Sequence, residues 1–282
     1  MIWKFNSKVP IAHVASMARS GETLLLRCLS QHSRLRVVHN LSKVDQAYEL
    51  ALFEFLQSYQ SNSISKTHAL VKPYQLRRGQ QLVLKQGVWR HPHPFDGIVL
   101  ARNPIAIFAS LRQYDVQATG KPWQAVWHLN EARMTRWLGD IAPDALDGFE
   151  SLGPVDQFAR FYNVRMTQLL ETKKQMIRYE DFVFNPQQNL EKIATELDVD
   201  FEPATLHSHQ GYQADAEGHG QNSLGQPIST KSVFKYLDVL SEAEFDQLAT
   251  KVDSVARMAG YQFHWGNSGL LSIDNYRKAM AG

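Results

Sequence analysis

The sequence lacks the features of several large classes of protein. It contains one cysteine, Cys28, so no internal disulfide can form and a metal site built from cysteines is excluded. No apolar run approaches the roughly 18 residues that a membrane-spanning helix needs. Residues 1–10 also lack the apolar stretch of a signal peptide. These absences predict a cytoplasmic protein with no transmembrane segment.

An excess of charge of either sign is missing as well. The chain has 30 Lys and Arg against 28 Asp and Glu, for a net charge of +2 at pH 7. Proteins that bind nucleic acids usually carry a strong net basic charge, so no nucleic-acid partner is expected. A local basic site for a small anion remains compatible with this balance. The 282 residues, 44% of them hydrophobic, are enough for a large core, and we expect one domain over residues 1–282.

Apolar runs alternate with helical patterns along the chain, which predicts an α/β fold with a mostly parallel sheet and helices on its faces. The expected strands are residues 11–17, 36–39, 82–85, 97–102 and 175–179. Helices are expected over 23–30, from Pro104 to at least Ser110, over 123–138 and over 154–170. A last helix begins at a capping box made by Ser241 and Glu244 and ends at Gly260.

The first chemical signal is the turn that joins the first strand to the first helix. Gly21 lets the backbone approach a phosphate, Ser20 and Thr23 offer hydroxyl donors, and Arg19 adds a charged one. The G-x-x-x-x-G-K-[ST] pattern is absent from the chain, which argues against an ordinary ATPase or GTPase. The alternative is a plain turn capped by Ser20 or Thr23.

The second signal is an arginine at the end of the strand 97–102 and a serine in the helix that follows. Ligands of open α/β sheets bind at the carboxyl ends of the strands, where Arg102 lies. Ser110 follows about two helical turns later. By itself this pair is compatible with an arginine that pairs locally and a serine without a function. Together, the two signals indicate two phosphate sites for one nucleotide.

The order and spacing of these segments resemble the PAPS-dependent sulfotransferases, where PAPS is 3′-phosphoadenosine 5′-phosphosulfate. That family carries a [KR]-S-G-[ST]-T loop, and residues 19–23 here read R-S-G-E-T. Its R-[ND]-P-x-x-x-x-x-S segment matches residues 102–110. A third match is the R-Y-E-D-F stretch at 178–182, with Asn185 and Pro186 after it. The resemblance covers roughly residues 11–262.

The resemblance implies a three-layer fold similar to that of P-loop NTPases, with about five parallel strands. It also implies transfer of a sulfuryl group from PAPS to a hydroxyl or amine of a small-molecule or glycan acceptor, giving 3′,5′-ADP without a metal. In this family the loop arginine neutralises charge at the bridging oxygen, which gives Arg19 a catalytic role. The nucleotide-binding residues implied are Arg19, Ser20, Gly21, Glu22, Thr23, Arg102, Ser110, Tyr179, Ser232 and Lys235.

Glu22 is the main departure from the family pattern, which has Ser or Thr there. A carboxylate beside an anion costs energy unless it points away, is protonated or pairs with a cation. We expect one of two roles for Glu22: it is the general base for the acceptor, or it is a surface residue in the first helical turn.

The general base of the cytosolic branch is also missing. That branch has K-T-H after a strand, and this chain reads Lys85-Gln86-Gly87. The sequence is more similar to the bacterial and protein-tyrosine branches, which place an acidic base after the second strand. His39 lies there and is the first choice, because a near-neutral pKa suits proton removal; its alternative is a solvent-facing histidine. Weaker candidates are His68, Asp45 and Glu49.

Two other functions stay open at this point. One is a small-molecule kinase of the P-loop type, and the other is a sulfotransferase-like nucleotide-binding protein without catalysis, which the departures at Glu22 and Gly87 motivate. The helix with Trp123, Trp127 and Trp137 either lines an aromatic acceptor pocket or packs in the core, and core packing is the more common case.

Overall fold

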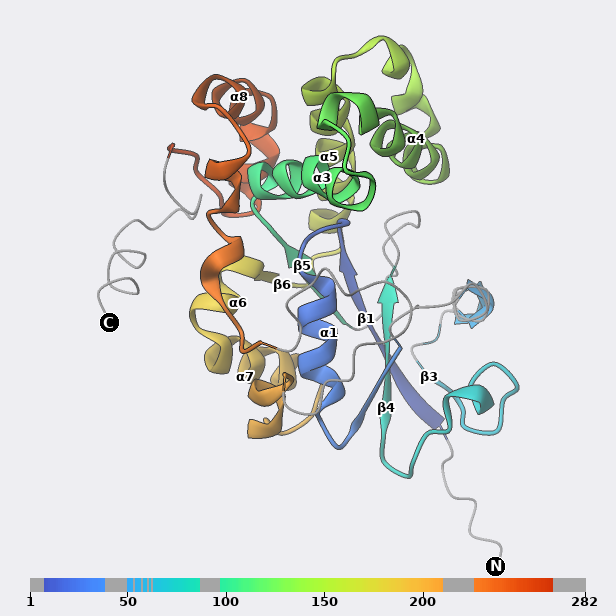
Figure 1. Ribbon diagram of the computed structural model, residues 1–282. Coiled ribbons are helices and arrows are strands. Elements are labelled where there is room, and N and C mark those ends of the chain that lie inside the picture. The colour runs from blue at the N-terminus through green and yellow to red at the C-terminus, as the bar shows by residue number, and fades with distance from the viewer. Residues whose placement is uncertain are drawn as a thin grey trace, which may run out of the picture.

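The computed structural model describes residues 8–38, 50–52, 54–56, 58–59, 61, 63–86, 97–209 and 226–265. Its centre is a six-stranded sheet in which the order β2-β4-β1-β5-β6 is parallel throughout, while β3 pairs antiparallel with the beginning of β1 (Figure 1). The strands are β1 (Lys8–Ser16), β2 (Leu35–Val38), β3 (Ser63–Ser65), β4 (Gln81–Gln86), β5 (Gly97–Ala101) and β6 (Gln175–Arg178).

The predicted α/β class, with five parallel strands between helices, is confirmed. Each strand reads as a short apolar run because both faces of a parallel sheet are covered; all five residues of β5 are buried. β3 was not predicted, since three residues are too few to show an alternating pattern. The strand expected over 175–179 ends one residue early, because Tyr179 begins the helix α6 (Tyr179–Phe184).

Helices cover the two faces of the sheet in separate groups (Figure 1). One group packs on Ala15 and Val99 and consists of α3 (Pro104–Thr119), α4 (Trp123–Ile141), α5 (Pro154–Glu171) and α8 (Glu242–Met258). The other group packs on Val14, Ile98 and Leu100 and consists of α1 (Glu22–Ser30), α6 and α7 (Pro186–Glu196). The central strands thus contribute alternate side chains to two hydrophobic cores, as the pleat of a strand requires.

The strand order places a reversal of the chain connections at the carboxyl edge between β1 and β5. From β1 the chain passes through α1 to β2 on one side of the sheet, whereas from β5 it passes through α3 to β6 on the other side. Two neighbouring strands whose connections leave in opposite directions form a topological switch point, where open α/β sheets bind ligands. The two predicted phosphate segments follow these two strands.

Polar side chains cap the helices that follow the sheet. The Asn103 side chain accepts a hydrogen bond from the Ile105 backbone N–H at 2.9 Å, and Pro104 occupies the first position of α3. The predicted capping box at α8 is confirmed, because Ser241 and Glu244 each accept a hydrogen bond from the other's backbone N–H. Glu244 also binds the buried guanidinium of Arg112 at 2.7 Å, which joins α8 to α3.

This double role of Glu244 predicts an unequal pair of stability losses. We expect Ser241→Ala to lower the free energy of unfolding by about 1 kcal/mol, since it removes only the cap. Glu244→Ala keeps the bond from its own N–H to Ser241 Oγ but removes the reciprocal half of the capping box and the partner of Arg112, and should lower it by about 2–3 kcal/mol. Glu244→Gln retains the cap and isolates the ion pair. Urea denaturation measures all three, and equal losses for both alanine variants would contradict the double role.

Candidate functional site

The turn after β1 has an unusual backbone. Arg19 and Gly21 both have a positive φ, 69° and 92°, and Ser20 lies between them. The Ser20 N–H donates to the Met17 carbonyl at 3.3 Å, and α1 begins with the Leu24 and Leu25 N–H groups bonded to Gly21. Residues other than glycine rarely adopt this conformation, so the surroundings of Arg19 must hold it in place. Such a turn at a helix N-terminus directs backbone N–H groups toward an anion.

Gly21 is required at its position for a steric reason too. A Cβ atom placed there would lie 2.3 Å from Cδ2 of the Tyr179 ring. The turn after β1 therefore packs directly on the first residue of α6. The sequence predicts that Gly21 lets a phosphate come close to the backbone. The structure shows that Gly21 also lets the Tyr179 ring come close.

Arg102 joins three segments that are far apart in the sequence. Its Nη1 donates to the Arg19 carbonyl and its Nη2 to the Ser232 carbonyl, both at 2.8 Å. The guanidinium lies 4.6 Å from the centroid of the Tyr179 ring, in a cation–π arrangement. The Tyr179 hydroxyl in turn is 2.6 Å from Oγ of Ser232, in the short 3₁₀ helix η6 (Thr230–Ser232). Four of the predicted nucleotide-binding residues thus lie together.

The Arg19 side chain extends to α3. Its Nε donates to Oγ of Ser110 at 3.1 Å, and its guanidinium lies 4.7 Å from the centroid of the Tyr114 ring. Burial lowers the pKa of Arg19, and the positive charge of Arg102 lowers it further. Two partly buried cations close to each other repel, so an anion bound between them would be stabilised by both. The two predicted phosphate segments meet at this point.

Two side-chain donors among the predicted nucleotide-binding residues are buried without a hydrogen-bond partner in the part of the chain that the structure describes. They are Oγ of Ser20 and Nε of Arg102, and Oε1 of Glu22 is an unpartnered acceptor in the same set. An unsatisfied buried donor costs about 1–3 kcal/mol, and native structures contain few of them. A phosphate oxygen accepts from both a hydroxyl and a guanidinium. The residues present therefore fit the phosphorylated nucleotide that the sequence analysis expects.

Glu22 is buried, with 7% of its surface exposed. The prediction that it is a surface residue is therefore wrong, because the first turn of α1 faces the neighbouring strand β4. Its Oε2 lies 3.4 Å from Nζ of Lys85, and pairing with a cation is one of the three ways to hold a carboxylate beside an anion. The expectation that Glu22 acts as a general base stays a prediction.

The remaining predicted residues are placed less centrally or lie outside the described part of the chain. Thr23 is half-buried in the first turn of α1, and Lys235 is exposed at the start of η7 (Lys235–Asp238), with no ion pair among the described residues. The ring of His68 packs at 4.5 Å on Phe55, and its Nδ1 accepts from the Leu70 N–H, which is a structural role. His39, Asp45, Glu49 and Gly87 lie outside the described residues.

Sequence reasoning missed two buried charges beside this edge. Glu180 is fully buried; its Oε1 accepts from the Asn103 N–H at 3.0 Å and its Oε2 from the Tyr261 hydroxyl at 2.8 Å. Burial raises the pKa of Glu180. Arg165 of α5 is also fully buried, and its Nη2 donates to the Ser16 carbonyl at 3.4 Å. The R-Y-E-D-F stretch was a signal for Glu180, whereas nothing in a helical pattern distinguishes Arg165 from a surface arginine.

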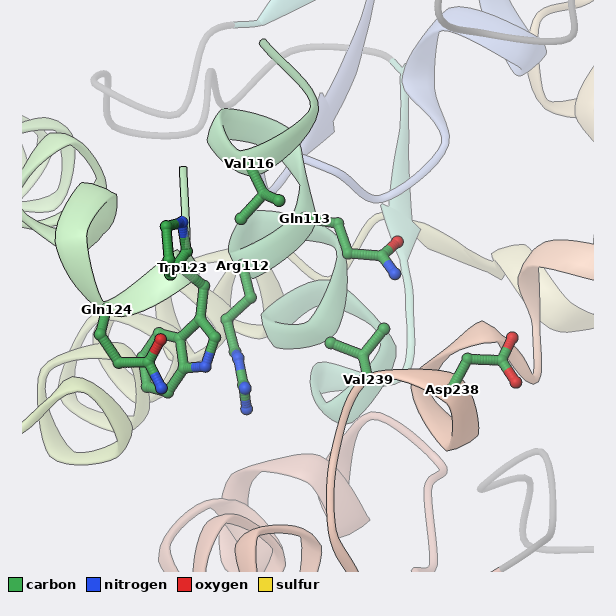
Figure 2. Close-up of a pocket in the computed structure, with 8 residues that line it drawn as sticks. Arg112, Gln113, Val116, Trp123, Gln124, Asp238 and Val239 are labelled. Carbon is green, nitrogen blue, oxygen red and sulfur yellow. The ribbon is translucent and has the colours of Figure 1, made fainter. Parts of the chain in front are cut away.

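A separate hollow of about 320 Å³ lies between α3, the start of α4 and the end of η7 (Figure 2). Trp123 lines it, with the Arg112 guanidinium 3.8 Å from the centroid of the indole. Trp127 and Trp137 are instead buried in the core, so the more common alternative holds for these two tryptophans. The hollow is on the side of α3 that carries Arg112 and Val116, whereas Ser110 contacts Arg19.

Several solved structures resemble this fold over most of the chain, and two of them are sulfotransferase domains with a TM-score of 0.50 or more. The sulfotransferase domain from the Synechococcus PCC 7002 olefin synthase is 17% identical with a TM-score of 0.55, over 94% of this chain and 100% of that one. The sulfotransferase domain from the curacin biosynthetic pathway is 19% identical with a TM-score of 0.50, over 91% and 99%. No protein-family model and no curated protein matches the sequence. The chain has the sulfotransferase fold.

Two further findings concern the described residues only. No helix among them is both long and apolar enough to cross a membrane. Within the same part of the chain, no group of three or more His, Cys, Asp or Glu side chains could hold a metal ion.

The packing of Gly21 on Tyr179 predicts a large effect of one added methyl group. We expect Gly21→Ala to lower the free energy of unfolding by about 3 kcal/mol or more, from the positive φ and the clash together. Gly120→Ala is the matched control, because Gly120 also has a positive φ of 69° but no atom within 4 Å of the added Cβ. It should cost about 1 kcal/mol. Equal shifts of the urea midpoint in both variants would contradict the close approach.

Proposed function

We propose that this chain transfers a sulfuryl group from PAPS to a hydroxyl or amine of an acceptor and releases 3′,5′-ADP. The observation that carries the proposal is the meeting of the two arginine and serine segments at the β1–β5 edge. Arg19 donates to Ser110, and Arg102 donates to the Arg19 carbonyl. The similarity of the fold to sulfotransferase domains supports the same function.

The proposed binding roles follow from position. Ser20, Gly21 and Thr23 hold the 5′-phosphate at the N-terminus of α1, where backbone N–H groups and the helix dipole favour an anion. Arg102 and Ser110 hold the 3′-phosphate. Tyr179, Ser232 and Lys235 complete the nucleotide site as the late segment 226–240 passes over it. The nucleotide would exchange some of the present internal hydrogen bonds of both arginines for contacts with its phosphates.

The proposed reaction depends most on stabilising the negative charge that develops on the oxygen that bridges sulfur and the 5′-phosphate. The acceptor oxygen or nitrogen forms a bond to sulfur while the bond from sulfur to the bridging oxygen breaks, and the electrons of that bond stay on the 5′-phosphate of 3′,5′-ADP. Arg19 would stabilise the charge that develops on this bridging oxygen. The acceptor's proton passes to a base, for which His39 remains the prediction.

One observation favours a second candidate, a nucleotide-binding protein without catalysis. The buried carboxylate of Glu22 at the phosphate loop adds negative charge where the donor's phosphates would bind. A cytoplasmic location, a small-molecule or glycan acceptor and a single domain stay predictions of the sequence.

Nucleotide selectivity tests the proposal directly. We expect 3′,5′-ADP to raise the thermal unfolding midpoint by several degrees, since a ligand at a hundred times its Kd adds about 2.7 kcal/mol. ATP and AMP, which lack the 3′-phosphate, should raise it much less. A larger shift with ATP than with 3′,5′-ADP would favour a kinase, and no shift with any of the three would contradict the nucleotide site.

Replacement of Arg102 should weaken nucleotide binding in a protein that still folds. Because the side chain supplies charge-assisted hydrogen bonds, Arg102→Ala is expected to raise the Kd for 3′,5′-ADP by about tenfold to a hundredfold, measured by titration calorimetry. Arg160→Ala is the control, since the Arg160 side chain also donates to two backbone carbonyls, those of Ala145 and Asp147, away from the site. Unchanged affinity in the folded Arg102→Ala protein would refute the 3′-phosphate assignment.

A further inference from the structure

A chain of buried hydrogen bonds connects the segment after α8 to the arginine of the second phosphate segment. Glu180, in the first turn of α6, is 0% exposed and lies at the centre of this chain. Its Oε2 accepts from the Tyr261 hydroxyl at 2.8 Å, and its Oε1 accepts from the Asn103 N–H at 3.0 Å. Asn103 follows Arg102 directly in the sequence. The roles proposed above use Arg102 but neither Glu180 nor Tyr261.

The Glu180 carboxyl group extends the sheet at a point where the backbone pairing has ended. The ladder between β5 and β6 ends at the pair Ala101 and Arg178, and the chain then turns into α6. The Asn103 N–H, two residues beyond the last pair, has no residue of β6 opposite it. Buried backbone N–H groups of native structures nearly always have an acceptor. Glu180 supplies this acceptor from a side chain, which fixes the backbone where Arg102 leaves the sheet.

The other end of this chain of bonds is anchored just after α8. Tyr261 is 0% exposed, and its hydroxyl donates to Glu180. Arg178 donates from Nη1 to the Gly260 carbonyl at 2.6 Å. Arg178 and Glu180 thus bind two consecutive residues of the segment after α8. Tyr179, between them in the sequence, packs on the turn after β1 instead.

We propose that Glu180 is a positioning residue for the 3′-phosphate: it holds the backbone beside Arg102 through the Asn103 N–H and is itself held by the Tyr261 hydroxyl. A charge-assisted hydrogen bond from a guanidinium to a phosphate depends on the placement of both groups, so the support behind Arg102 matters. The effect on nucleotide affinity rests on the proposed function, whereas the hold of Glu180 on Asn103 does not. Tyr261 thereby contributes to nucleotide selectivity from 81 residues further along the chain.

The proposal predicts a loss of affinity that is confined to the 3′-phosphate. Glu180→Met removes both acceptor oxygens at a similar side-chain length, and we expect the Kd for 3′,5′-ADP to rise by about tenfold. The Kd for AMP, which lacks the 3′-phosphate, should stay within about twofold of the native value. Glu180→Gln keeps an acceptor for the Asn103 N–H, so both Kd values should stay within about twofold.

The experiment measures both Kd values by displacement titration calorimetry, with a pair of matched tyrosine variants beside the two at Glu180. Tyr261→Phe removes only the hydroxyl that anchors Glu180, and should raise the Kd for 3′,5′-ADP by about fivefold and leave that for AMP unchanged. Tyr162→Phe is the control and should keep both native values. Tyr162 is also 0% exposed, but its hydroxyl has no hydrogen-bond partner in the described part of the chain.

Three outcomes would overturn the proposal. An equal rise of both Kd values in Glu180→Met and Tyr261→Phe would mean that Glu180 only stabilises the fold. Equal shifts in Glu180→Met and Glu180→Gln would mean that it acts through its charge alone, since both variants lose that charge. Native affinities in Glu180→Met would mean that Arg102 needs no such support. If Glu180→Met does not fold, Tyr261→Phe against Tyr162→Phe decides the same question.

Amide exchange without nucleotide keeps this test separate from that of the proposed function. In protein labelled with ¹⁵N at asparagine, Glu180→Met and Tyr261→Phe should each speed the exchange of the Asn103 amide by about tenfold. The amides of Asn130 and Asn189, in α4 and α7, are internal references. If the native chain binds 3′,5′-ADP no better than AMP, the proposed function fails, and faster exchange at Asn103 alone still supports the hold of Glu180. Unchanged exchange at Asn103, or equal acceleration at all three amides, would refute that hold.

Discussion

The interaction on which the rest of the site depends is the bridge made by the Arg102 guanidinium. It follows the strand next to β1, and it binds the carbonyls of Arg19 and Ser232 while it lies over the Tyr179 ring. One side chain thereby joins the turn after β1, the start of α6 and the segment 226–240. Because Arg102 binds the carbonyls of Arg19 and Ser232 and contacts Tyr179, these three segments are held relative to one another. Preorganisation of this kind reduces the free energy that binding must spend on ordering loops.

Around that bridge the protein buries further charged side chains. Glu180 is satisfied by the Asn103 N–H and the Tyr261 hydroxyl, and Glu22 pairs with Lys85 of β4. Buried charges contribute little net stability, but removal of one partner is costly. The site is therefore expected to be sensitive to single substitutions at these buried charges.

Much of the fold could be predicted because the relevant interactions are local or periodic. The apolar runs of β1, β4 and β5, the capping box at Ser241 and the glycine turn at Gly21 each leave a pattern within a few residues. The errors have physical causes as well. β3 is too short to show a period, and Tyr179 reads as the end of a strand although its backbone already turns into α6. The surface alternative for Glu22 fails because burial depends on β4, which is far away in the sequence.

By itself the sequence determined the class of fold, the two segments expected to bind phosphates and the absence of a Walker lysine, since each is written in residue types at a fixed spacing. Only the tertiary structure decided that Arg19 contacts Ser110, that Trp127 lies in the core while Trp123 lines a hollow, and that Arg165 is buried beside the phosphate loop. The physical reason is that parallel strands bring distant segments to one edge of a sheet. Which side chains then pair there depends on packing, and packing leaves no periodic trace in the chain.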